Sequence, residues 1–154
     1  MAWHNNKGLL DSVVALLSEL FHGGSMTPQQ TVLVDTLFGL MGHLAGTDSI
    51  VTSHEADFAN NLMRELDLPI NGCELASHAF QRGRKREMDI DTQVQAFLAV
   101  YPAATEVAGK LYQAVLHLAV ADERLRPREH IFLEHLTTSL GFDPAQLDRR
   151  LAEL

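Results

Sequence analysis

One stretch of sequence occurs twice, and it constrains the fold more than any other feature of the chain. HLAGTDSIVTSHE begins at His43, and HLAVADERLRPRE begins at His117, 74 positions later. Each copy is typical of a helix, a corner of a few residues and a second helix. The repeat predicts two helical hairpins related by pseudo-twofold symmetry. The same offset pairs apolar residues further on, Phe58 with Phe132, Leu62 with Leu136 and Leu66 with Leu140.

Helical signals cover the rest of the chain. Thr27, Pro28 and Gln30 supply an N-cap, a proline at the first helical position and a capping-box glutamine. No alternation of period two indicates a strand. We expect an all-α bundle of about seven to eight helices, with an amphipathic helix in residues 1–24 and a helical domain over 27–154. After the helix that begins at Pro28, we expect helices over 53–67, 72–83, 92–101, 103–121, 127–140 and 144–153, with Asn71, Asp91 and Asp143 as N-caps.

Three glycines interrupt the helix that is expected to begin at Pro28. Gly39, Gly42 and Gly46 each cost a helix about 1 kcal/mol relative to alanine. Three such destabilising glycines in one helix indicate that another helix approaches closely at these positions.

The N-terminal amphipathic helix has a wide apolar face between Leu9 and Phe21. Asp11 and Glu19 interrupt this stretch, and it falls short of the roughly 20 apolar residues that a membrane-spanning helix requires. Packing of the face on the protein's own core is the favoured interpretation. Contact with a membrane surface or a partner helix is the alternative.

Composition excludes several classes of function. The 154 residues are 46% hydrophobic and 21% charged, as in a globular domain that folds unaided. A net charge of -8 argues against binding to nucleic acid. Cys73 is the only cysteine, and the N-terminus lacks the features of a secretory signal, so we expect a cytoplasmic location.

The corners of the two hairpins carry the same carboxylates. Asp48 and Asp122 stand where a helix ends, and the exposed carbonyls there disfavour further negative charge. Glu55 and Glu129 stand at the third position of the following helix, from which a carboxylate can reach back to the N-cap amide. Either the aspartates cap backbone amides of the corners, or the four residues share a divalent cation.

An ordinary EF-hand is excluded even though DSIVTSHE and DERLRPRE resemble the second half of such a loop. The earlier positions that should supply acidic ligands are Leu44 and Gly46 in one copy, and Leu118 and Val120 in the other. A cation would therefore need oxygens from both corners or from water, which predicts weak affinity. The identity of such an ion is left open.

No motif in the chain supports catalysis. There is no phosphate-binding glycine loop, no nucleophile elbow and no thiolate metal cage. Cys73 and His78 lie on different faces of their helix, so a structural cysteine is favoured over a nucleophile. His43 and His117 are expected to be core histidines with one hydrogen-bond partner. The basic run Arg82, Arg84, Lys85 and Arg86 is either a solvated loop or a site for an acidic protein partner.

The paired signatures GHLAGTDSIVTSHEADF and HLAVADERLRPREHIFLEHL resemble the TerB-like tellurite-resistance family. The resemblance covers about residues 31–151 and is closest to the TerB-like portion of the DnaJ-like co-chaperone DjlA. It implies about seven helices with pseudo-twofold symmetry. It also implies an acidic metal-binding cluster, which carries over to Asp48, Glu55, Asp122 and Glu129. Ser49 and Glu123 stand where the family commonly has glycine, which weakens the case for a cation.

The resemblance implies a non-enzymatic binding module in a tellurite, oxidative or envelope stress response, acting through a protein partner. The alternative is a purely structural interaction domain in which each corner carboxylate caps a helix. Proteins of the DjlA type also carry a J-domain with a His-Pro-Asp tripeptide, and no such tripeptide occurs in this sequence. We therefore expect no direct co-chaperone activity.

Overall fold

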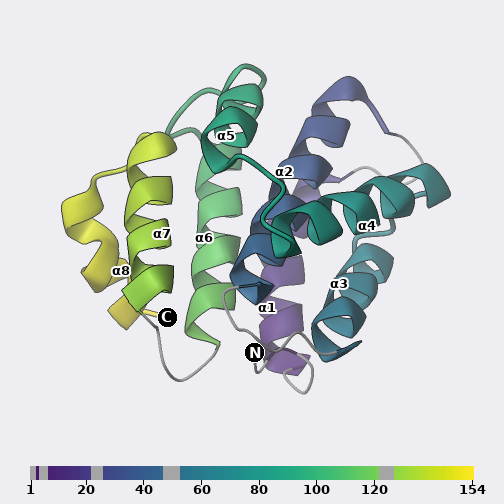
Figure 1. The fold of residues 1–154 in the computed structure, drawn as a ribbon, viewed down its shortest axis with the longest axis horizontal. Helices are drawn as coiled ribbons and strands as arrows, with labels where there is room; N and C mark the ends of the chain where they lie inside the picture. The colour runs from purple at the N-terminus through teal and green to yellow at the C-terminus, as the bar shows by residue number, and fades with distance from the viewer. Residues whose placement is uncertain (1–2, 4–6, 22–25, 47–52, 122–126) are drawn as a thin grey trace.

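The computed structural model describes residue 3 and residues 7–21, 26–46, 53–121 and 127–154, with the side chains of 53–55 excepted. Within these ranges the protein is all-α, as the sequence predicts, with no strand (Figure 1). Two short 3-10 helices, Ser18–Leu20 and Pro144–Gln146, accompany the α-helices. The eight α-helices of the described chain are α1 (Lys7–Leu17), α2 (Pro28–Ala45), α3 (Ser53–Glu65), α4 (Ile70–Arg84), α5 (Ile90–Leu98), α6 (Glu106–Val120), α7 (Pro127–Ser139) and α8 (Leu147–Ala152).

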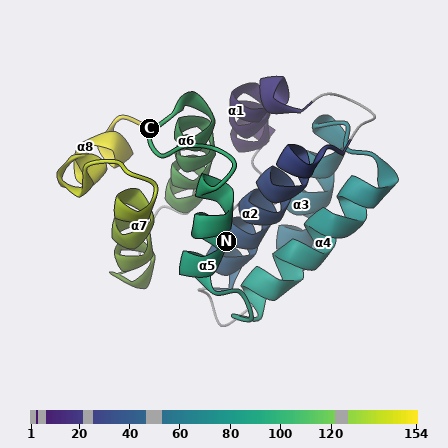
Figure 2. The same cartoon turned by 90° about the horizontal axis from the view of Figure 1, so that it is seen from above.

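Helices α2 and α6, the first helices of the two repeats, occupy the middle of the molecule. Figure 1 shows α7 and α8 on one side of α6, and α3 and α4 on the other side of the bundle beside α2. Figure 2 shows the same order from above, with α1 lying near α6. Both central helices bury long apolar stripes, including Leu37 and Phe38 on α2 and Leu111 and Leu116 on α6. The predicted hairpins are therefore present as α2–α3 and α6–α7, and their pseudo-twofold relation stays a prediction.

Helices α2 and α4 approach each other at the glycines that the sequence singled out. A Cβ atom on Gly42 would lie 2.0 Å from the carbonyl oxygen of Phe80. On the facing helix, a Cβ atom on Gly83 would lie 2.0 Å from the carbonyl oxygen of Gly39. Neither distance leaves room for a side chain, because the atoms in contact are backbone. The predicted close approach is confirmed, and α4 is the helix that makes it.

Four of the predicted helix starts, at Pro28, Ser53, Pro127 and Pro144, are confirmed, and two of them show the predicted caps. The Thr27 hydroxyl accepts a hydrogen bond from the Gln30 amide at 3.2 Å, and the Gln30 side chain accepts one from the Thr27 amide at 3.4 Å. This reciprocal pair is the capping box, and Pro28 follows it at the first helical position. Asp143 caps the turn before α8, because its carboxylate accepts from the Ala145 amide at 3.0 Å.

Three other predicted starts are wrong by two or three residues. Helix α4 begins at Ile70, so Asn71 is inside it and is not its N-cap. Helix α5 begins at Ile90, and its cap is Asp89, whose carboxylate accepts from the Asp91 amide. Asp89 and Asp91 are both suited to capping this helix, and Asp89 is the N-cap. Helix α6 begins at Glu106, because Ala104 adopts a φ of 57° and interrupts the helical backbone before it.

Three helices end in the same way, with one residue in the left-handed region. Asp67, Arg86 and Gly141 have φ values of 56°, 61° and 89° after α3, α4 and α7. After α4, the Glu87 amide donates to the Arg82 carbonyl and the Arg86 amide donates to the Gly83 carbonyl. This is the Schellman arrangement, which usually has glycine at the left-handed position. Here Arg86 takes that position, and its side chain contacts His43 of α2.

The N-terminal helix packs on the protein's own core, as the favoured interpretation expects. Val13 and Leu17 of α1 are fully buried, and α1 lies mainly against α6. Ahead of α1, Trp3 is 1% exposed, and its indole Nε1 donates to the carbonyl of Leu118 at 3.0 Å. Its ring centroid lies 5.5 Å from that of Phe58. Across the described ranges, no helix has the length and apolar character needed to span a membrane.

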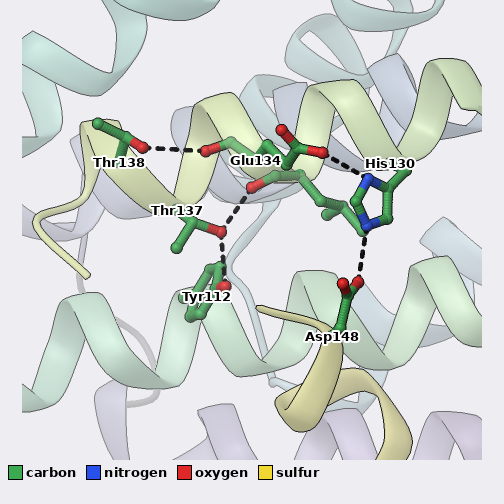
Figure 3. A network of polar contacts seen from close by, with 7 residues as sticks. Tyr112, His130, Glu134, Thr137, Thr138 and Asp148 are labelled. Atoms are coloured by element: carbon green, nitrogen blue, oxygen red, sulfur yellow. Dashed lines mark hydrogen bonds and ion pairs between the residues drawn. The ribbon is translucent and has the colours of Figure 1, made fainter. Parts of the chain in front are cut away.

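Polar contacts fasten the C-terminal helices to α6 (Figure 3). The Thr137 hydroxyl donates to the Leu133 carbonyl at 2.6 Å, so the buried Tyr112 hydroxyl, 2.6 Å from it, donates to Thr137. On the same helix, His130 lies 2.8 Å from Asp148 of α8. Its other ring nitrogen lies 2.7 Å from Glu134. Helix α7 therefore holds α6 through a buried contact and α8 through an exposed one.

Candidate functional site

The two hairpins meet at the ends that carry their corners. The ring centroids of His43, in the last turn of α2, and Phe132, in the second turn of α7, are 4.7 Å apart. Trp3 makes the complementary connection, because it touches Phe58 of α3 and donates to Leu118 near the end of α6. In Figure 1 the ends of α2 and α6 and the starts of α3 and α7 all lie in the lower part of the view. Each hairpin's first helix thus ends near the other's second helix.

The four acidic residues predicted at the corners are only partly described. Asp48 and Asp122 lie outside the described residues, and so does the side chain of Glu55. Helices α3 and α7 begin at Ser53 and Pro127, so Glu55 and Glu129 occupy the third helical position that the sequence predicts. Glu129 is the one predicted ligand whose side chain is placed, and it is 1% exposed. Its carboxylate lies in the first turn of α7, where the helix dipole stabilises negative charge.

The described residues do not by themselves form a metal site. Among them, no group of three or more His, Cys, Asp and Glu side chains is arranged to hold a metal ion. Because three of the four predicted ligands are outside this part of the chain, the cation hypothesis stays a prediction.

A positive cluster lies beside the meeting point of the hairpins. The guanidinium nitrogen Nη1 of Arg86 is 2.6 Å from Nε2 of His43 and 2.7 Å from Nδ1. Burial and the charge of Arg86 together lower the pKa of His43 to about 4. Burial and the nearby charge of Arg128, in the first turn of α7, lower the pKa of Arg86. His43 is therefore neutral at pH 7, and Arg86 and Arg128 bring two positive charges close together near the last turn of α2 and the first turn of α7.

Acid is expected to destabilise the protein through His43. Its folded pKa of about 4 is below the usual 6.5, so the unfolded chain binds this proton more readily. The stability is fully present above about pH 6.5, falls as the pH drops from there to about 4, and then levels off. Given the partial exposure of the ring, we expect a loss of about 1 to 2 kcal/mol from this group. Urea unfolding at a series of pH values measures it.

Matched histidine variants separate this effect from general acid denaturation. His43→Gln should flatten the decline in unfolding free energy between pH 6.5 and 4. His130→Gln should change the curve in the opposite sense, because the Asp148 hydrogen bond raises the pKa of His130 and makes its protonated form stabilising. An unchanged pH dependence in His43→Gln contradicts the assignment.

The four residues of the basic run predicted to bind an acidic partner make different contacts, and their role in partner binding stays a prediction. Arg82 forms an ion pair with Asp35 of α2 at 3.0 Å, and Arg86 turns back onto His43. The backbone of Arg84 lies against Gly42 and Gly46, at the crossing of α2 and α4. Lys85 is exposed. The run therefore divides into residues that hold α4 in place and residues that face solvent.

Two adjoining hollows follow α4, and we call them together the α4 groove. The larger, of about 730 Å³, lies between α3 and α4; Met63, Leu68, Ile70, Cys73, Ser77 and His78 are among its lining residues. The smaller, of about 400 Å³, shares two of these residues and is lined by Ser77, His78, Gln81, Arg82, Lys85 and Glu87. The sequence pattern did not predict the groove, and it placed Cys73 and His78 on different faces of their helix with no shared site. The one sequence signal for it is Leu68-Pro69-Ile70, two apolar residues at a helix junction.

These observations define the chain as an all-α module built on two helical hairpins whose corner-bearing ends meet. Residues 35–152, most of the chain, match the family described as Tellurite resistance protein TerB. The chain therefore belongs to the TerB family, as its paired signatures predict.

The chain is also similar to part of several curated co-chaperone proteins. The chain is 29% identical over 128 residues to the Co-chaperone protein DjlA of Shewanella oneidensis, covering 83% of this chain and 49% of the relative. It is 27% identical over 124 residues to DjlA of Mannheimia succiniciproducens, covering 80% and 43%. It is 28% identical over 126 residues to DjlA of Haemophilus influenzae, covering 82% and 44%. The chain thus spans less than half of each relative's length. No solved structure matches it significantly.

Proposed function

We propose that this chain is a non-enzymatic binding module that serves a stress response through a protein partner and holds a divalent cation weakly at its acidic corners. Membership in the TerB family and the similarity to DjlA co-chaperones support the stress-response and partner parts of the proposal. The observation that carries the cation part is the contact of His43 with Phe132 at 4.7 Å, since it joins the corner-bearing ends of the two hairpins.

One described residue, Glu129, has the chemistry of a ligand in a weak cation site. Glu129 supplies a carboxylate, and its burial would shield an ion held there from water. Asp48, Glu55 and Asp122 would complete the oxygen ligands. Arg86 and Arg128 oppose a cation, because their positive charges lie at the same end of the bundle. This opposition is the reason to expect low affinity.

The cation hypothesis predicts a melting temperature that depends on metal and on the corner aspartates. We expect millimolar Ca²⁺, Mn²⁺ or Zn²⁺ to raise the melting temperature of metal-stripped protein by a few degrees, because a ligand that prefers the folded state stabilises it. The double change Asp48→Asn/Asp122→Asn should abolish the rise. The control Asp11→Asn/Asp67→Asn removes the same charge from exposed positions on α1 and after α3. This control should keep the metal-dependent rise in melting temperature. Differential scanning fluorimetry measures all three proteins.

One alternative function has structural support. Helices α3 and α7 begin where Glu55 and Glu129 can each cap a helix from the third position. If metal-stripped wild-type protein shows no rise with any of the three ions, the cation is rejected and a purely structural interaction domain remains. A rise that survives Asp48→Asn/Asp122→Asn would place the ion elsewhere.

A further inference from the structure

We propose that the α4 groove binds a partner protein through an extended acidic segment, with an apolar side chain anchored near Ile70 and carboxylates placed near Lys85. This deepens the proposed function and depends on its protein-binding part. The groove follows α4, and residues of α3 line its larger hollow. Figure 1 shows α3 and α4 beside each other.

The first end of the groove is suited to an apolar anchor. Ile70 is 81% exposed although it is a large hydrophobic residue, and it opens α4 at the edge of the larger hollow. Met63, Leu68 and Cys73 line the same hollow. Large aliphatic side chains that meet in a concave surface form the usual pocket for a buried anchor at an interface.

The other end of the groove is positive, although the whole chain carries a net charge of -8. Arg82 and Lys85 line the smaller hollow with one carboxylate, Glu87. Arg82 forms an ion pair with Asp35 of α2, so it holds this side of the hollow in place. The exposed Lys85 is available to a ligand. A local positive site on an acidic protein selects and orients an acidic partner.

Charges at the apolar end fix the direction of the bound segment. The larger hollow is lined by two carboxylates, Asp67 and Glu74, and by one cation, Arg64, so its net charge is negative and carboxylates beside the anchor would be repelled there. From Ile70 to Lys85, α4 and its cap span about 22 Å at 1.5 Å per residue. An extended segment covers this distance with about seven residues. The preferred ligand therefore has an apolar residue, then about six others, then Asp or Glu.

A random twelve-residue peptide library displayed on phage, panned against the whole chain, tests the proposal. We expect the enriched peptides to share an apolar residue followed about seven positions later by acidic residues. Synthetic fluorescein-labelled copies, measured by anisotropy, should bind at least about tenfold more weakly when the acids become lysine. An absence of enrichment, or enriched peptides without this pattern, overturns the proposal.

Matched variants locate the site on the chain. Ile70→Glu and Lys85→Glu should each weaken peptide binding by at least about tenfold, since one adds a charge at the anchor and the other reverses the acidic contact. Ile131→Glu is the control for Ile70, because Ile131 is 66% exposed on α7, away from the groove. Lys7→Glu, on the exposed start of α1, is the control for Lys85. Equal effects of test and control variants overturn the groove assignment.

The exposure of the mutated side chains keeps folding intact, and unchanged circular dichroism verifies this. Failure of the peptide test is distinct from failure of the proposed function, because metal-dependent melting is measured without any peptide. Peptides that bind with the expected pattern but lose nothing in Ile70→Glu and Lys85→Glu would leave a protein-binding module with its site elsewhere.

Discussion

Replacing Gly42 by alanine is expected to destabilise the protein by about 3 kcal/mol or more. The new Cβ would lie 2.0 Å from the Phe80 carbonyl oxygen and 2.9 Å from the Arg84 amide nitrogen. Both atoms are backbone, so no side-chain rotation relieves the clash and α2 and α4 must separate. Overpacking in a tight core typically costs 1 to 3 kcal/mol, and a clash with rigid backbone belongs at the top of that range or above it. Thermal or urea unfolding followed by circular dichroism measures the loss.

Gly109→Ala is the matched control for this prediction. Gly109 lies within α6, and the nearest atom to its added Cβ is Phe142 Cζ at an ordinary 3.9 Å. Alanine there should stabilise the helix by about 0.5 to 1 kcal/mol. If Gly42→Ala also stabilised the protein, or cost less than about 1 kcal/mol, the close packing of α2 on α4 would be wrong.

Replacing Trp3 by alanine should cost about 3 to 5 kcal/mol, the range for truncation of a large buried aromatic side chain. Trp3 precedes the first helix but is 1% exposed, with its indole bonded to Leu118 and its ring near Phe58. Its loss would open a cavity between α3 and α6 and loosen the N-terminal segment. Urea unfolding by far-UV circular dichroism measures the change.

Trp3→Phe separates the two contributions of this residue. Phenylalanine keeps an aromatic ring in the cavity and leaves the Leu118 carbonyl without its indole donor, so we expect a loss of about 1 to 2 kcal/mol beyond the smaller ring's packing. Because Trp3 is the only tryptophan, its emission in the wild-type protein should also be blue-shifted and move to the red on unfolding. Unfolding of Trp3→Ala at the wild-type urea concentration would show that the N-terminal segment is not part of the core.

Much of the fold could be predicted because residues at the ends of a helix signal where it begins and stops. Thr27, Pro28 and Gln30 determine the start of α2 without help from the rest of the chain. The glycines of α2 predicted a closely packed neighbouring helix, because no local interaction offsets the helix stability that glycine loses relative to alanine. The start of α5 was misplaced because Asp89 and Asp91 could each cap it, and the start of α4 was misplaced because its N-cap residue, Pro69, makes no side-chain capping bond that a sequence could signal.

The site was less predictable because it depends on contacts between distant residues. Lys85 and Arg86 are adjacent in a uniform basic run, but Arg86 has a left-handed backbone and contacts His43, whereas Lys85 lines the groove. The groove itself combines residues of α3 with the outer side of α4, which no periodicity brings together. By contrast, the third-position placement of Glu55 and Glu129 followed directly from the helix starts.

The distance between the two corners tests the central claim most directly. Spin labels at Ser49→Cys and Glu123→Cys, equivalent positions in the two repeats, can be placed in a Cys73→Ser background and measured by pulsed dipolar electron resonance. Neighbouring helices pack 8 to 10 Å apart, so with the label arms we predict a narrow distribution below about 20 Å. Helix α2 has 18 residues, which make it about 27 Å long. A distance of about 27 Å or more would put the corners at opposite ends and contradict a shared acidic site.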